Sequence, residues 1–184
     1  MKKGMLLTVA ALVFAGVAST QIKAQTQTKA QIRAERVERG RYLVSIAGCH
    51  DCHSPKVDAM MTPDPARMLS GRPATTQPPM QGPNEIRASL DFTAFAGPWG
   101  NSYAANLTPD RETGIGGRYD EAAFIKTIRT GKKPEGEALA PPMPWPVYSK
   151  MTDEDLKAVF AYLRTLPPVS NFVRASPVQV ATQH

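Results

Sequence analysis

The stretch of residues 54–117 limits most strongly what this chain can fold into. It contains eight prolines before residue 99 and shows neither helical nor strand periodicity. A connection of about 60 residues without regular structure is uncommon, because irregular backbone buries poorly and leaves polar groups that need partners. With 13 glycines and 17 prolines among 184 residues, the whole chain is expected to have few elements and much loop. We therefore expect a large bound cofactor to supply part of the apolar mass that holds this stretch in place.

Three segments show the apolar spacing of amphipathic helices, residues 34–47, 120–130 and 152–166. Gly131 follows the second segment, where a left-handed residue often ends a helix, and two prolines follow the third. Thr152 is a suitable N-cap with three acidic residues after it. No strand pattern competes with these segments. The sequence therefore predicts an all-α fold, with three main helices and long irregular loops.

The two cysteines of the chain lie in one pentapeptide, Cys49-His50-Asp51-Cys52-His53. The pattern C-x-x-C-H is the attachment signature of c-type haem, in which two thiols add to the porphyrin vinyl groups and the imidazole binds iron. One turn of chain brings the two sulfurs to neighbouring vinyl positions and His53 under the ring centre, and its second nitrogen then needs a hydrogen-bond acceptor. We expect one covalently bound haem c, held by Cys49, Cys52 and His53.

A thioredoxin-like dithiol and a zinc site are the alternatives for this pentapeptide. A redox C-x-x-C follows a strand in a βαβ unit, whereas here a predicted helix precedes it. Zinc requires a second pair of ligands, and the remaining histidines are His50, inside the motif, and His184, at the end of the sequence. Both alternatives fit the sequence less well than haem.

The sequence resembles the class I (mitochondrial-type) cytochromes c. The resemblance covers GCHDCH, the preceding helix with Gly40 and Tyr42, and MTDEDLKAVFAYLRTLPPV, which in that family crosses the first helix at a contact of small and aromatic residues. The runs GPWGNSYAANLTPDRETGIG, FIKTIRTG and PPMPWPVYSKMTDEDL are similar to a bacterial branch of exported carriers and of cytochrome subunits of periplasmic alcohol and sugar-acid dehydrogenases. Those subunits carry three C-x-x-C-H motifs, so this chain resembles a single module of one.

The resemblance implies that the loop with Trp99 and Asn106 lies around the haem. Either side chain is then a candidate to bond to a haem propionate or to pack on the porphyrin ring. The basic residues of the first helix are expected to form a solvated face rather than a docking patch; they are Arg33, Arg36, Arg39 and Arg41.

The sixth ligand of the iron separates an electron carrier from a gas binder. Among the eight methionines, Met143 lies in a loop with three flanking prolines, which restrict the backbone around a soft thioether. Met80 also follows two prolines. The resemblance places the distal methionine in the loop of Met143. We therefore expect His53 and Met143 to bind the iron, with Met80 as the second candidate for the sixth ligand. If Met143 only fills the core, the sixth coordination position of the iron is left without a protein ligand.

Residues 1–24 have the features of an export signal. Lys2 and Lys3 precede an apolar run of about 14 residues, shorter than the roughly 20 that span a bilayer. Cleavage after Ala18 or Ala24 fits the small residues there. We expect a signal peptide at residues 1–24 and a single cytochrome c domain at 25–184, with its core at 34–168 and a tail at 169–184. A retained signal would keep the protein at the membrane.

The formal net charge of +6 falls to +3 when the signal and its three lysines are removed, which is too weak to indicate nucleic-acid binding. The sequence predicts a periplasmic electron carrier, not itself an enzyme and without a transmembrane segment once mature. It would move single electrons from an exported dehydrogenase to an oxidase or another cytochrome. Two alternatives stay open. One is a haem subunit of a periplasmic complex that oxidises alcohols, sugar acids or sulfur compounds, and the other is a haem-based gas binder or sensor.

Overall fold

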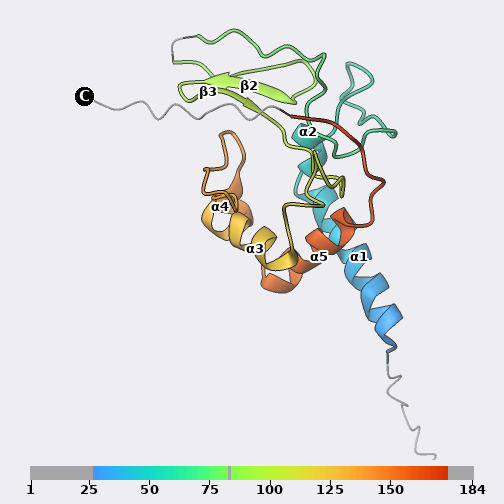
Figure 1. Cartoon of the computed structure of the whole chain (residues 1–184). Coiled ribbons are helices and arrows are strands. Elements are labelled where there is room, and N and C mark those ends of the chain that lie inside the picture. Colours follow the sequence, from blue (N-terminus) through green and yellow to red (C-terminus); the bar gives the residue numbers. More distant parts are fainter. Residues whose placement is uncertain (1–26, 83, 174–184) are drawn as a thin grey trace, which may run out of the picture.

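The computed structural model describes residues 27–82 and 84–173 (Figure 1). Its elements in chain order are α1 (Lys29–Ile46), α2 (Cys49–His53), β1 (Arg87–Ala88), β2 (Ala94–Gly97), β3 (Gly100–Tyr103), α3 (Glu121–Thr130), α4 (Trp145–Tyr148) and α5 (Asp153–Leu163). The signal peptide expected at residues 1–24 lies outside the described residues. Within the described part, no helix has both the length and the apolar character needed to cross a bilayer.

The three predicted helices are present, with ends set by local capping. α1 begins five residues earlier than predicted, because Thr28 caps it and Gln31 bonds back to the Thr28 backbone. Asp120 caps α3, which ends at Gly131 with a φ of 67°, in the left-handed region predicted for it. Thr152 caps α5 through the amide of Asp155. The predicted ends at Gly131 and Thr152 are thus present, whereas the start of α1 was predicted five residues too late and α5 ends at Leu163, before the predicted residue 166.

The buried core forms where α1 and α5 cross, and α3 closes it from a third side. Gly40 lies at the crossing and lets the two backbones approach, since a Cβ there would meet the backbone of Ala158 and the side chain of Tyr162. Leu43 and Val44 of α1 pack in the same cluster as the apolar side chains of α5, Leu156, Val159, Phe160 and Leu163. The Phe124 ring of α3 lies 5.2 Å from the Phe160 ring.

The prediction of an all-α fold is wrong, because a three-stranded antiparallel sheet lies within the stretch that was expected to be irregular. The strand order is β1-β2-β3, with Arg87 opposite Ala96 and with Phe95 opposite Ser102. β2 is buried at all four positions, so it lacks the alternation of apolar and polar residues that marks a half-exposed strand. β1 has only two residues. Neither strand carries a periodic signal, and both form through pairing with the strand that follows them in the chain.

The rest of this stretch is held by hydrogen bonds that return to α2 and to the segment after β3. The Gly71 amide donates to the carbonyl of His53 at 2.8 Å, and the Leu107 amide donates to the carbonyl of Leu69. Leu69 is fully buried. Its amide donates to the buried Ser54 hydroxyl. The polar groups of this long loop are therefore largely satisfied by the chain itself.

Candidate functional site

The C-x-x-C-H pentapeptide forms α2, a short helix that begins after Gly48, whose φ of 67° turns the chain out of α1. Cys49 and Cys52 are three residues apart, so they lie on the same side of one helical turn. Both are free thiols in partly buried positions. His53 is the last residue of the helix. The structure thus brings the three predicted attachment residues together on one turn.

The imidazole of His53 is held through one of its two nitrogens. Nδ1 lies 2.8 Å from the carbonyl oxygen of Ala105, which can only accept, so Nδ1 carries the proton and Nε2 is left with a free lone pair. Burial lowers the pKa of His53, against an opposing effect of the Ala105 carbonyl, and this favours the neutral ring that a metal requires. The acceptor expected for the second nitrogen is therefore present.

The cysteine environment does not favour a redox dithiol. Burial raises the pKa of the Cys49 thiol to about 11 and also raises the pKa of Cys52, whereas a reactive thiol has a lowered pKa. Among the residues that the structure describes, no group of three or more histidine, cysteine or acidic side chains is arranged to hold a metal ion. Neither alternative for the pentapeptide gains support.

Lys56 contacts the end of α2 in a way that sequence analysis missed. Its Nζ donates to the carbonyl oxygens of His50 and Asp51, at 2.9 Å each, and to that of Ser54. The last carbonyls of a helix lack partners within the helix and carry partial negative charge. A lysine three residues beyond the motif thus both caps the attachment helix and places a positive charge beside it.

Met143 lies in the segment between α3 and α4, directly before α4. Its amide donates to the carbonyl of Ala140 at 3.2 Å, and its own carbonyl accepts from the Trp145 amide at 2.9 Å. The Met143 side chain is partly buried against the same core cluster that Cys49 contacts. Met80, the second candidate, is 81% exposed. Burial therefore favours Met143 over Met80 as a distal ligand.

Tyr148 connects the Met143 side of the molecule to the attachment helix. Its hydroxyl donates to the carbonyl of Ala47 at 2.6 Å, two residues before Cys49. Burial, followed by the charges of Cys49 and Cys52, raises the pKa of Tyr148 to about 12. In Figure 1 the segment between α3 and α4 lies opposite α2, with β2 and β3 above both.

The two loop residues considered for haem contacts have their polar atoms engaged within the protein. Asn106 is 1% exposed and bonds to Thr108, to Thr113 and to the carbonyl of Val169. The Trp99 indole donates to the Ser102 hydroxyl. Asn106 therefore ties the chain after α5 to the loop, and neither residue has a free donor aimed at a ligand.

The residues at this site fit a c-type haem. Two thiols three residues apart precede an imidazole with a free Nε2, and a thioether comes from a separate loop; this is the donor set of a haem with histidine and methionine ligands. The Ala105 carbonyl fixes the His53 ring from behind, as the hydrogen-bond partner of a metal-binding imidazole does. The chemistry of the donors therefore agrees with the cofactor that the motif predicts.

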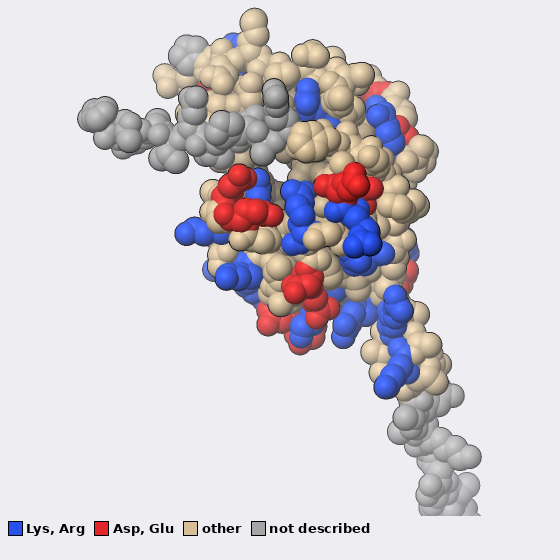
Figure 2. Space-filling view, in the orientation of Figure 1, with Lys and Arg blue, Asp and Glu red and all other residues tan. Residues whose placement is uncertain are grey.

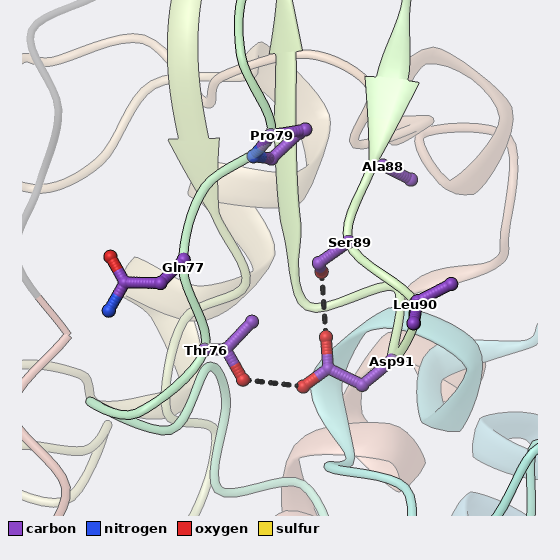
Figure 3. A pocket seen from close by; sticks show the side chains of 7 residues that line it. All are labelled: Thr76, Gln77, Pro79, Ala88, Ser89, Leu90 and Asp91. Atoms are coloured by element: carbon purple, nitrogen blue, oxygen red, sulfur yellow. Dashed lines mark hydrogen bonds between the residues drawn. The ribbon is translucent and has the colours of Figure 1, made fainter.

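A separate depression lies at the sheet, away from the motif (Figure 3). Asp91 forms its polar side and accepts hydrogen bonds from the hydroxyls of Thr76 and Ser89. Thr93 donates to the same carboxylate. The carboxylate is thus occupied in fastening the loop of residues 76–91 to the sheet, and the depression shares no residue with the haem site.

The basic residues of α1 are largely paired with acids. The Arg36 guanidinium nitrogen Nη1 lies 3.7 Å from Oε2 of Glu121, and Nε of Arg39 lies 2.9 Å from Oδ1 of Asp155. Figure 2 shows charges of both signs mixed over the helical part of this face. These pairs agree with the expected solvated helix face.

The chain is similar to curated cytochromes of bacterial dehydrogenases. It is 31% identical over 151 residues to the fructose dehydrogenase cytochrome subunit of Gluconobacter japonicus, covering 81% of this chain and 25% of that subunit. It is 34% identical over 144 residues to the gluconate 2-dehydrogenase cytochrome c subunit of Pantoea cypripedii, covering 77% of this chain and 26% of that subunit. A diheme cytochrome c-type protein of Cereibacter sphaeroides is 27% identical over 173 residues, covering 91% of this chain and 50% of that protein. No protein-family model matches the chain.

The site and these similarities support a c-type cytochrome. The chain spans about a quarter of the length of the two dehydrogenase subunits and half that of the diheme protein.

Proposed function

We propose that this chain is a single-haem cytochrome c that carries one electron at a time in the periplasm. Cys49 and Cys52 would hold the haem by thioether bonds, with His53 as the proximal ligand and Met143 as the distal ligand. When bound, haem supplies an iron that alternates between the ferrous and ferric states. The observation that carries the proposal is the hydrogen bond from Nδ1 of His53 to Ala105, which leaves Nε2 available to a metal.

The side chains of the protein have three tasks in this function. The Ala105 carbonyl fixes the His53 ring, so its orientation does not change when an electron arrives or leaves. The buried cluster that Cys49 and Met143 contact excludes water from the site. A thioether and an apolar surrounding both favour the ferrous state and raise the reduction potential. Together these features keep the site nearly unchanged between oxidation states.

We place the protein in class I of the cytochromes c. The support is the crossing of α1 and α5 at Gly40, with Tyr162 beside it, which agrees with the contact of small and aromatic residues expected from the resemblance. The three-stranded sheet is an addition to the helical arrangement that the resemblance implied.

An exported dehydrogenase is the electron donor that we propose, with an oxidase or another cytochrome as the acceptor. Support comes from the similarity to cytochrome subunits of fructose, gluconate and alcohol dehydrogenases. These relatives also favour a second form of the same function, in which the chain is the haem subunit of such a complex. Copurification of the untagged partner with the tagged, full-length protein separates a stable subunit from a free carrier.

The test is to produce the full chain together with a c-type maturation system. One haem per chain is expected from the mass and from the pyridine haemochrome spectrum, and the oxidised protein should show the sulfur-to-iron charge-transfer band. Met143→Ala should abolish that band and let the reduced protein bind carbon monoxide readily, whereas Met80→Ala should change neither. A colourless protein would overturn the proposal, and ready carbon monoxide binding by the unmodified chain would favour a gas binder.

A further inference from the structure

The sheet that sequence analysis missed touches the segment that carries Met143. Ser102 of β3 is 5% exposed, and its hydroxyl donates to the carbonyl of Pro141, two residues before Met143. The same hydroxyl oxygen accepts from Nε1 of Trp99 at 3.2 Å. Trp99 lies in the turn between β2 and β3, so its indole orients the Ser102 hydroxyl from within the hairpin. The oriented hydroxyl in turn holds the Met143 segment through Pro141.

Two further contacts hold the segment from the side of α3. The Leu139 amide donates to the carbonyl of Gly131 at 2.7 Å. Gly131 also lies against the Trp145 indole, where a Cβ would come within 2.3 Å of the ring. Between these contacts, Pro141, Pro142 and Pro144 have no amide hydrogens, so the Met143 amide, which donates to the Ala140 carbonyl, is the one backbone donor of residues 141–144. Ser102 therefore adds a restraint from outside to a segment with few donors of its own.

We propose that Ser102 is a positioning residue for the distal ligand, and this inference rests on the proposed function. Its hydrogen bond to Pro141 holds the Met143 segment in place, so the thioether stays at the iron instead of exchanging with outside ligands. Residues that hydrogen-bond to a metal ligand or to its segment orient the ligand and raise its affinity for the metal. A thioether carries no charge to retain it, so the restraint on its segment has a direct effect on ligand persistence.

The experiment compares Ser102→Ala with Ser89→Ala in the full-length, haem-loaded protein. Ser89 is a matched control, because its partly buried hydroxyl bonds to Asp91 and Ala94 in the same sheet region and does not reach the Met143 segment. The rate of carbon monoxide binding to the reduced protein reports how often the methionine leaves the iron. It should rise about tenfold in Ser102→Ala, since the loss of a buried hydrogen bond near 1.4 kcal/mol corresponds to that factor.

Two more measurements separate positioning from a general loss of stability. In Ser102→Ala the reduction potential should fall, and the amides of Met143 and Trp145 should exchange their hydrogens faster. Ser89→Ala should leave all three measurements unchanged even when it lowers the melting temperature by a similar amount. If Ser102→Ala does not mature, Trp99→Phe removes the indole donor to Ser102 together with part of the ring that lies against Gly97, and it should shift the same measurements in the same direction by less.

Unchanged carbon monoxide binding and potential in Ser102→Ala would overturn the inference, as would equal shifts in Ser102→Ala and Ser89→Ala. Failure of the proposed function looks different: Met143→Ala would then leave the charge-transfer band of the otherwise unmodified protein intact.

Discussion

Gly40 and Ala158 meet backbone to backbone where α1 and α5 cross, since a Cβ at Gly40 would lie 1.9 Å from the carbonyl oxygen of Ala158. α1, which leads into the attachment motif, therefore packs directly on α5, and the absence of a side chain at Gly40 determines how closely the two helices approach. This crossing supports the start of α2 from one side.

Gly40→Ala is expected to lower the free energy of unfolding by about 1–3 kcal/mol, the usual effect of overpacking a close contact. In an exposed helix the same change would instead stabilise by roughly 0.5–1 kcal/mol. Denaturation with guanidinium chloride measures the difference. Arg33→Ala, at an exposed position of the same helix, should change the free energy of unfolding by no more than about 0.5 kcal/mol. Equal stability of Gly40→Ala and the unmodified protein would mean that the helices can separate without loss.

Lys56→Met should destabilise the protein by about 1–3 kcal/mol, because it removes the ammonium donor from the His50 and Asp51 carbonyls and leaves His50 with only the longer bond from the Ser54 amide. It should also lower the reduction potential, since a positive charge beside the proximal histidine favours the ferrous state. Potentiometric titration and denaturation measure the two effects. Lys56→Arg retains the charge and should restore most of the potential. Lys150→Met, at an exposed position, is the control, and a potential shift of the same size there would contradict the role of Lys56.

The pentapeptide and the caps at Gly131 and Thr152 could be predicted because their causes are local. Cys49, Cys52 and His53 act within one turn, and Gly131 ends α3 through its own backbone conformation. Ala105 could not be identified as the partner of His53, because every residue has a carbonyl and these two are 52 positions apart. Only the need for an acceptor was predictable.

The sheet was missed for a related reason. β2 has the sequence AFAG, in which small residues are buried on both faces, so no alternation marks it as a strand. It is held by pairing with β1 and β3, and Ser102 of β3 in turn bonds to the Met143 segment. Residues 54–117 also make hydrogen bonds with one another, such as that from the Leu107 amide to the Leu69 carbonyl, and the expectation that a cofactor supplies part of the apolar mass there stays a prediction.

Asp91 should make the fastening of residues 76–91 sensitive to acid (Figure 3). Burial alone would raise the pKa of Asp91, but hydrogen bonds from Ser89, Thr76 and Thr93 lower it overall from its ordinary value of 3.8. A lowered pKa in the folded state means that the carboxylate adds stability above pH 3.8, and that this stability is lost as the pH falls through the lowered pKa.

Asp91→Asn tests this contribution. The stability difference between the unmodified protein and Asp91→Asn should be constant near neutral pH and shrink as the pH falls below 3.8, as measured by denaturation at a series of pH values. Glu112→Gln, at an exposed position of another loop, should show no such convergence. A difference that is the same at all pH values would mean that the charge of Asp91 contributes nothing to the fastening.

Tyr148→Phe should lower the free energy of unfolding by about 1–2 kcal/mol, because it removes the donor to Ala47 and leaves that carbonyl without its partner. The ring is retained, so the change isolates the bond between α4 and the start of the attachment helix. Tyr42→Phe is the matched control, since Tyr42 is 52% exposed and should lose almost nothing. Because the Tyr148 hydroxyl bonds to Ala47, directly before Gly48 and Cys49, amide exchange at Gly48 and Cys49 should also accelerate in Tyr148→Phe alone. Faster exchange in both variants, or in neither, would show that α2 is held without this bond.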